Sequence, residues 1–375
     1  MQFTSTQPTS QPTSQPIAQP IARPIIGMDI AKSIFQLHTV DPDTGEIERF
    51  KLKRARVLEF FANRRVSLVA IEACGGAHHW ARELVKLGHL VKLIPAQAVR
   101  PFVQRDKTDA KDALGIWVAA AQPHIRAVPV KSEQSQACLG LHSLRGQLMK
   151  MRIMQTNALR GLLYEFGIVL PEGHNALLDK LPGALAAAEQ AGTVPQVLAG
   201  AVLEQLQRVH SLQRDIDLFD KRISALIKTN QQMQTLQAIP GIGPLTASAL
   251  VASVADMASF ESSRQFAAWV GLTPRQTGTG GKIRQLGLSK RGDVYLRTML
   301  MHGARAVVAR ATHSSWLVKL LERRPYNVAV AAVANKLART AWAVLAKGRA
   351  FDPLKWHPTE QMPTMPATMP ATMPA

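Results

Sequence analysis

Two short apolar runs in the first third of the chain each end in a carboxylate, and this pattern constrains the fold more than any other feature. One run is closed by Asp29 and the other by Glu72. Their length and composition predict β-strands, so each acid is expected at the C-terminal end of a strand. Asp109 and Asp112 lie three residues apart in a segment that predicts the start of a helix, where residues at this spacing share a face. A sheet packed against this helix would bring all four carboxylates to one point.

Such a cluster would not be stable without compensating charge. Carboxylates a few ångströms apart repel one another and take up protons, unless a divalent cation such as Mg²⁺ or Mn²⁺ is bound. Thr108 followed by two acids also predicts an ordinary N-cap with acids that face the helix dipole, so a purely structural role is the alternative for that pair alone. The joint occurrence with two strand-end acids favours the metal site.

The charge balance indicates a polyanionic partner. Lys and Arg total 45 against 26 acidic residues, and the formal net charge is +19. Basic residues recur throughout the chain, which is typical of nucleic-acid binding. The two cysteines exclude a disulfide framework and fit a reducing cytosol, and we expect Cys74 to be packed in the core. Polar residues interrupt the apolar stretch 328–345, and the first 24 residues lack the apolar core of a secretory signal, so we expect neither a membrane span nor a signal peptide.

The chain divides by pattern into an α/β part and an α part. Strand and helix patterns alternate in the first part, which predicts an α/β sheet domain with three leading antiparallel strands. Long polar-faced helical patterns follow and predict a projecting helical hairpin, whose basic face is either solvated or grips a duplex. Repeats of Gln, Pro, Ser and Thr at one end, and of Met, Pro, Ala and Thr at the other, predict disorder. The expected divisions are a disordered leader 1–24, a catalytic domain 25–130, a helical arm 131–230, a C-terminal domain 231–352 and a disordered tail 353–375.

Two glycine-containing segments in the second half indicate contacts with nucleic acid. Residues 239–247 predict a helix-hairpin-helix, in which the free N–H groups of the second helix can bind phosphate; a plain turn between helices is the alternative. Residues 273–282 predict a flexible glycine-rich loop with hydroxyls and cations, and their spacing does not match a P-loop. The residues expected to contact nucleic acid in and after these segments are Gly241, Gly243, Arg275, Lys282, Lys290 and Arg291.

Five motifs in order resemble the DEDD transposases of bacterial insertion sequences (insertion sequence family 110), which are bridge-RNA-guided DNA recombinases. The sequence around Glu72 is most similar to that of the branch 1111, whose elements carry short subterminal inverted repeats. The resemblance covers the chain from Ile25 to about Asp352. The motifs lie at 27–32, 71–75, 106–112, 240–243 and 271–297.

The resemblance implies a fold, a cofactor and a nucleophile. It implies an RNase-H-like (Holliday-resolvase-like) mixed-sheet domain in which Asp29, Glu72, Asp109 and Asp112 bind Mg²⁺. It also implies that a hydroxyl in the C-terminal domain attacks the scissile phosphodiester. Many relatives have serine just before the loop glycine, whereas this chain has Thr279. Two metal ions could still activate this more crowded hydroxyl. The other candidate nucleophiles are Thr277 and Ser289, of which Ser289 is weaker because its setting predicts a helix start.

The resemblance further implies the partners of the protein. These are DNA at the element ends and at the target, a structured noncoding guide RNA, and other copies of the chain in a dimer or tetramer, all in the bacterial cytoplasm at the nucleoid. Two alternatives stay open. A junction-resolving or other metal-dependent nuclease would use the same acids to activate water, and a decayed copy would only bind nucleic acid. The missing serine favours the decayed copy, whereas the four retained acids argue against it.

Overall fold

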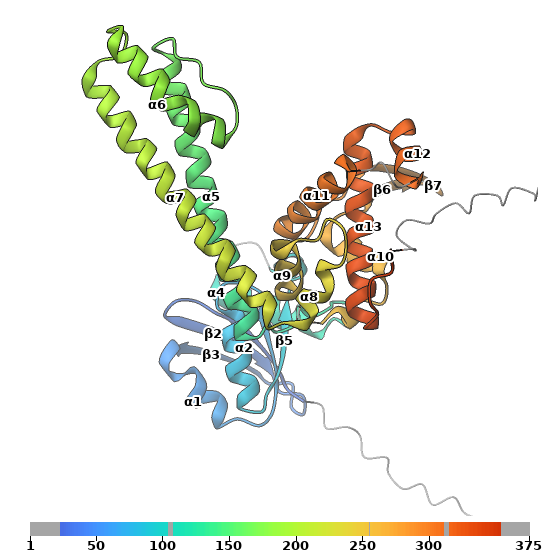
Figure 1. Ribbon diagram of the computed structural model, residues 1–375. Coiled ribbons are helices and arrows are strands. Elements are labelled where there is room, and N and C mark those ends of the chain that lie inside the picture. Colours follow the sequence, from blue (N-terminus) through green and yellow to red (C-terminus); the bar gives the residue numbers. More distant parts are fainter. Residues whose placement is uncertain (1–22, 104–107, 255, 311–314, 354–375) are drawn as a thin grey trace, which may run out of the picture. The chain divides into compact units, whose positions relative to one another are not determined.

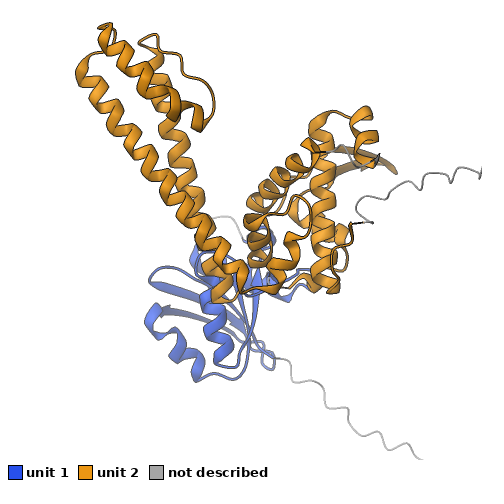
Figure 2. Cartoon of the chain, viewed as in Figure 1, with its two compact units in different colours: residues 1–130 blue, residues 131–375 orange. Residues whose placement is uncertain are grey.

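The computed structural model describes residues 23–103, 108–254, 256–310 and 315–353. These residues form two compact units, residues 1–130 (unit 1) and residues 131–375 (unit 2) (Figure 2). Residues 1–22 and 354–375, for which the sequence predicts disorder, lie outside the described residues, as does Asp106 of the paired-aspartate motif.

Unit 1 is built on a five-stranded mixed sheet with the strand order β3-β2-β1-β4-β5 (Figure 1). β1, β2 and β3 are antiparallel neighbours, which confirms the three leading antiparallel strands. β4 and β5 continue the sheet in parallel with β1. The strands are β1 Ile25–Asp29, β2 Ile34–Val40, β3 Ile47–Lys53, β4 Leu68–Glu72 and β5 Leu90–Ile94.

Helices cover both faces of this sheet. Because side chains alternate along a strand, Val69 and Ile71 of β4 enter one apolar core whereas Ala70 enters another. The first core contains residues of α1 and α2, and the second contains residues of α3 and α4. The helices of unit 1 are α1 Val57–Ala62, α2 Ala77–Lys86, α3 Ala96–Val99 and α4 Asp109–Ala121, with short 3-10 turns η1 Arg54–Arg56 and η2 Arg100–Phe102.

Unit 2 begins with the two long helices expected from the sequence, α5 Glu133–Tyr164 and α7 Gln196–Lys228, which run side by side (Figure 1). α6 His174–Gln190 packs at their far end around a leucine-rich core. At the near end, a small cluster that includes Cys138 of α5 and Ile227 of α7 also contains Ala252 of α9. The arm is therefore joined to the rest of unit 2 through apolar packing.

The remaining helices of unit 2 surround one large apolar core. They are α8 Gln231–Gln237, α9 Pro244–Ser253, α10 Ser263–Val270, α11 Val294–Ala309, α12 Ser315–Arg323 and α13 Tyr326–Lys347, with a 3-10 turn η3 Met257–Ser259. Among the described helices, α13 alone is long and apolar enough to suit a membrane span, but Val330, Val333 and Leu337 are buried in this core. α13 thus has the burial pattern of a core helix.

The segment expected to be a flexible loop is instead a β-hairpin. β6 Pro274–Thr279 pairs with β7 Lys282–Leu288, and Thr279 faces Lys282 across the turn. Gly280 and Gly281 have φ values of 56° and 79°. Two residues with positive φ are what the tight type I′ hairpin turn requires, so the glycines direct a defined turn rather than flexibility. The expected flexible loop was wrong, because the strand pairing on either side holds the glycines in a turn.

Candidate active site

Asp29 and Glu72 are the last residues of two neighbouring parallel strands, as the sequence predicts. The register pairs Met28 of β1 with Ile71 of β4, so the two acids follow at the next position of each strand. Both side chains are half-buried. The carboxyl end of the parallel pair therefore carries two acidic groups at one edge of the sheet.

Asp109 and Asp112 lie in the first turn of α4, which confirms the predicted helix start. Thr108 is the N-cap, and its hydroxyl accepts a hydrogen bond from the backbone N–H of Lys111. The unpaired N–H groups and the dipole at a helix start stabilise nearby negative charge. The start of α4 is thus a favourable place for acids even before a cation is considered.

The structure brings three of the four predicted acids together. Asp29, Asp109 and Asp112 each offer a carboxylate oxygen, and these oxygens all lie within 4.8 Å of one another. Asp109 is exposed and the other two are half-buried, so the group is open to solvent on one side. We call these three residues the carboxylate group.

Glu72 does not belong to this group. α4 packs mainly over β1 and β2, and the two acids of its first turn lie beside Asp29 at the end of β1. Glu72 and Asp29 both lie near Cys74, since their negative charges raise the pKa of its thiol, although partial burial of the sulfur is the larger cause. Cys74 itself is exposed, so its expected place in the core was wrong.

A glycine in β1 allows α4 to approach the sheet this closely. A Cβ added at Gly27 would lie 2.4 Å from the carbonyl oxygen of Ala113 and 2.7 Å from the backbone nitrogen of Trp117. No side chain fits at that distance. The Trp117 indole also donates a hydrogen bond of 3.0 Å to the carbonyl oxygen of Ile25. Sequence reasoning missed this contact, although a glycine inside an apolar strand is the signal for close backbone approach.

The carboxylate group suits a small hard cation. Carboxylate oxygens are the ligands that Mg²⁺ and Mn²⁺ prefer, and no sulfur or nitrogen ligand is part of the group. Ligands on opposite sides of Mg²⁺, each held at about 2.1 Å, are about 4.2 Å apart. The oxygens within 4.8 Å of one another are therefore spaced as ligands of one or two shared ions would be.

The hydroxyl expected to act as nucleophile lies at the tip of the hairpin. Thr279 is the last residue of β6 and directly precedes the turn glycines. Its neighbours Thr277, Arg275 and Lys282 are also exposed, so hydroxyls and cations lie together along this two-stranded ribbon. Ser289 is different, because its Oγ is buried and has no hydrogen-bond partner among the described residues. Ser289 also does not begin a helix, since α11 starts at Val294 with Asp293 as its N-cap.

The base of the hairpin is held by close backbone packing. A Cβ added at Gly292 would lie 1.8 Å from the carbonyl oxygen of Trp269. The Arg297 guanidinium donates hydrogen bonds to the carbonyl oxygens of Val270 and Arg291, at 3.0 and 3.1 Å. These contacts join the end of α10, the start of α11 and the segment between them. Sequence reasoning missed Arg297 as the residue that connects them.

The other residues expected to contact nucleic acid lie on two loops. Lys290 and Arg291 are exposed, and Lys290 has a φ of 53°, an uncommon left-handed conformation for a residue other than glycine. Gly241 and Gly243 lie between α8 and α9, and α9 begins at Pro244. A Cβ on Gly241 would lie 2.8 Å from the carbonyl oxygen of Gly303, so this turn packs against α11.

Comparison with known proteins identifies the family. The family described as "Transposase IS116/IS110/IS902 family" matches residues 233–319, and the family DEDD_Tnp_IS110, described as "Transposase", matches residues 26–168. A protein of Pseudomonas aeruginosa named "Probable family 20 transposase" is 45% identical over 333 residues, which cover 88% of this chain and 98% of the relative. The chain belongs to the IS110 family of insertion-sequence transposases.

Two further proteins are similar to this chain. The transposase for insertion sequence element IS1111A of Coxiella burnetii is 39% identical over 334 residues, which cover 87% of this chain and 90% of the relative. A pilin gene-inverting protein of Moraxella bovis is 29% identical over 135 residues, covering 35% of this chain and 42% of that protein. The transposase is thus a DNA transposase or recombinase, and its DEDD family implies dependence on a divalent metal ion.

Proposed function

We propose that this transposase cleaves and rejoins DNA strands by phosphoryl transfer at the carboxylate group. Asp29, Asp109 and Asp112 would hold Mg²⁺ or Mn²⁺, and Glu72, at the end of the adjacent strand, would complete the ligand set. The observation that supports this most directly is the 4.8 Å limit on the separation of the three carboxylate oxygens. When bound, the cations would polarise the phosphate and favour the ionised form of the attacking hydroxyl.

The hydroxyl of Thr279 is the proposed nucleophile. Its Oγ1 would form a bond to the scissile phosphorus while the bond from phosphorus to the leaving strand breaks, and the leaving strand would depart with a free hydroxyl. A second attack by a strand hydroxyl on the phosphothreonine would release Thr279 and rejoin the DNA. The exposed position of Thr279 beside Gly280 supports this role, because nothing in the hairpin covers the approach.

A nicked suicide substrate tests the nucleophile. If Thr279 attacks, the protein should become trapped on the DNA through a bond that survives denaturation, and Thr279→Ala should form no adduct. Thr279→Ser should keep or increase the activity, because a primary hydroxyl reaches phosphorus with less crowding. Thr277→Ala is the matched control on the same strand. Wild-type cleavage by Thr279→Ala, with no adduct in any variant, would reject covalent recombination in favour of a nuclease that uses water.

The domain folds and partners complete the proposal. Unit 1 would be an RNase-H-like catalytic domain, since it has a mixed five-stranded sheet with acids at adjacent strand ends. The turn between α8 and α9 would act as a helix-hairpin-helix that binds DNA phosphates. Element ends and target DNA would be selected by a noncoding guide RNA and joined by a dimer or tetramer of the transposase in the bacterial cytoplasm.

The net charge of +19 supports a tightly bound RNA. We expect the purified protein to carry RNA and to lose affinity for it by about 10³-fold or more between roughly 50 and 200 mM salt, because phosphate contacts release counterions. Binding that does not change over this range of salt would contradict an electrostatic RNA interface.

A further inference from the structure

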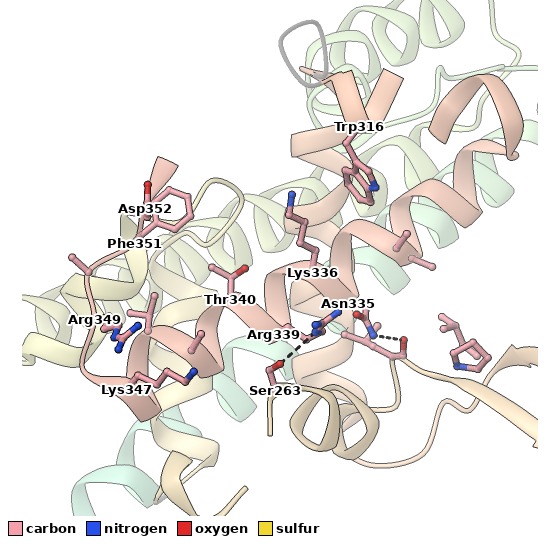
Figure 3. Close-up of a pocket in the computed structure, with 18 of the residues that line it drawn as sticks. Ser263, Trp316, Asn335, Lys336, Arg339, Thr340, Lys347, Arg349, Phe351 and Asp352 are labelled. Atoms are coloured by element: carbon pink, nitrogen blue, oxygen red, sulfur yellow. Dashed lines mark hydrogen bonds between the residues drawn. The ribbon is translucent and has the colours of Figure 1, made fainter. Parts of the chain in front are cut away.

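A groove on α13 is not part of the site described above. It encloses about 1020 Å³ and extends along one side of α13, where it is also lined by residues of α10, α12, the base of the β6–β7 hairpin and the segment that follows α13 (Figure 3). The lining residues on α13 recur every three or four positions from Val328 to Lys347. One continuous helix face of about 29 Å is therefore open along the groove.

The floor of this groove is apolar. Ala331, Ala332 and Ala343 contribute small side chains to it, and Trp316 of α12 stands at one end. Only 44% of the most apolar part of α13 is buried within the protein. The alanines of the floor are half-buried, so the groove leaves part of an apolar helix face open to a ligand.

The rim of the groove is strongly basic. Four of its residues carry positive charge and one, Asp352, carries negative charge; the cations are Lys336, Arg339, Lys347 and Arg349. The ammonium group of Lys336 lies 4.7 Å from the centre of the Trp316 ring, so a cation and an aromatic face adjoin one another. Burial lowers the pKa of Lys336. An anion bound beside the ammonium group would raise this pKa again.

The apolar floor and the basic rim together indicate which class of molecule can bind in the groove. A second copy of the same face would place four cations against four cations. A DNA duplex could contact the cations but would leave the alanine floor uncovered, since its bases are stacked inside. An unpaired strand offers both surfaces at once, with phosphates for the rim, a base face for Trp316, and sugar carbons for the floor.

We propose that the groove along α13 binds a segment of unpaired DNA. Deoxyribose fits the floor better than ribose, because a 2′-hydroxyl placed over alanine methyl groups would lose its hydration without gaining a partner. The strand would bind with little sequence preference, as stacking and phosphate contacts are common to all nucleotides. This inference does not depend on metal binding or on Thr279.

Fluorescence anisotropy of the full chain with labelled oligodeoxythymidine of 12 nucleotides measures the proposed contact. Ala332→Trp should fill the floor and weaken binding about tenfold, whereas Ala158→Trp, at an exposed alanine of α5 outside the groove, should not. Trp316→Ala should weaken it to a similar degree, because stacking on one aromatic ring contributes about this much. Lys336→Ala should lower the slope of log affinity against log salt by about 0.7, the value for one phosphate of a single strand.

Three comparisons decide the identity of the occupant. Oligouridine of the same length should bind more weakly than oligodeoxythymidine, and a duplex should lose no affinity in Ala332→Trp. A single strand that carries 5-iododeoxyuridine should cross-link on irradiation to the peptide that contains Trp316. Equal loss of duplex binding, tighter binding of RNA, or cross-links only outside the groove would overturn the proposal.

Discussion

The proposed metal ligands and the proposed nucleophile lie in regions that differ in packing. The ligands lie at the start of α4 and the end of β1, and the nucleophile lies at the tip of the β6–β7 hairpin. The acids of the carboxylate group are attached to a strand and a helix whose backbones touch at Gly27, with apolar cores on both faces of the sheet. Thr279 lies on a ribbon of two strands in which Ile283 remains 72% exposed. Two strands alone are marginally stable, so the ribbon depends on its turn and on its base.

This difference in packing suits the different functions proposed for the two regions. Ligands of a metal ion must keep fixed distances, and close packing is the way a fold sets distances to within tenths of an ångström. A nucleophile that forms and then releases a bond to DNA needs access from solvent, which an exposed hairpin provides. Substitutions in the first region should therefore alter metal binding, whereas those in the second should leave metal binding unchanged.

Removal of a ligand should have the largest effect. Asp29→Ala, Asp109→Ala or Asp112→Ala should lower strand cleavage by about 10³-fold or more, because several kcal/mol of transition-state stabilisation are lost with the cations. Nucleic-acid binding should survive, as the proposal has these acids hold metal rather than phosphate. Cleavage and gel-shift assays measure the two properties separately.

Glu72→Ala tests whether Glu72 is a fourth metal ligand. A loss equal to that of Asp29→Ala would place Glu72 among the ligands, although it lies outside the group of three. Full cleavage by any of the four variants would remove that acid from the site. A variant that fails to fold, as judged by circular dichroism, would show that its acid is structural. The amide variant at that position, Asn for an Asp or Glu72→Gln, would then test the charge alone.

Gly27→Ala should have the next largest effect. The added methyl group must push α4 away from β1 by more than half an ångström, because its carbon would otherwise lie 2.4 Å from a carbonyl oxygen. We expect weaker Mn²⁺ binding and a 10- to 100-fold loss of cleavage, since misplacement by about 1 Å can cost that much. Isothermal titration with Mn²⁺ distinguishes this effect from simple loss of stability.

Gly146→Ala provides the matched control for Gly27→Ala. Gly146 lies inside α5, and an added Cβ there meets no atom within 4 Å. The substitution should stabilise the helix by about 0.5–1 kcal/mol and leave Mn²⁺ binding unchanged. Unchanged Mn²⁺ affinity in both variants would contradict the role of Gly27 in spacing the carboxylate group.

The sequence predicted the first region better than the second, for a physical reason. Apolar runs and the N-cap at Thr108 are local signals, so the strand ends at Asp29 and Glu72 and the start of α4 followed from them. The distance from Asp29 to the start of α4 depends on a contact between residues almost ninety positions apart, and only the position of Gly27 within an apolar run hinted at it.

The hairpin shows the opposite limitation. Its strands contain no alternation of apolar and polar residues, because both faces are exposed, and without that alternation the glycines suggested a loop. Cys74 likewise belongs to a turn between β4 and α2, which its residue type could not reveal. Local patterns therefore located the elements of the site, whereas tertiary packing determined which acids meet.

Arg297→Ala should have a smaller effect that is confined to the second region. Loss of its hydrogen bonds to Val270 and Arg291 would loosen the base of the hairpin, and we expect roughly tenfold slower adduct formation. Mn²⁺ binding should be unchanged, because no residue of the carboxylate group is in unit 2. Trypsin should cut faster at Lys282 or Arg284 in this variant, and unaltered digestion would show that Arg297 does not hold the hairpin.

Low pH should destabilise unit 2 through His142, without a direct effect on strand cleavage. Its ring nitrogens pair with the Tyr295 hydroxyl at 2.8 Å and with Ser248 Oγ at 3.0 Å, which connects α5 to α11 and α9. Burial, reinforced by the charge of Arg145 and opposed by that of Asp220, lowers the pKa of His142 to about 4. The neutral ring is therefore the form that the folded state favours.

The sign of the pH effect follows from this shift. The unfolded state binds the proton with the ordinary pKa of about 6.5, so between pH 6.5 and 4 it binds more protons than the folded state, and stability falls as the pH falls through this window. At pH 5 the loss relative to pH 7 should be on the order of 2 kcal/mol. Hydrogen exchange in α9 and α11 should speed up accordingly, and His142→Gln should flatten this pH dependence. An equally steep loss of protection in His142→Gln would assign the acid sensitivity to other groups.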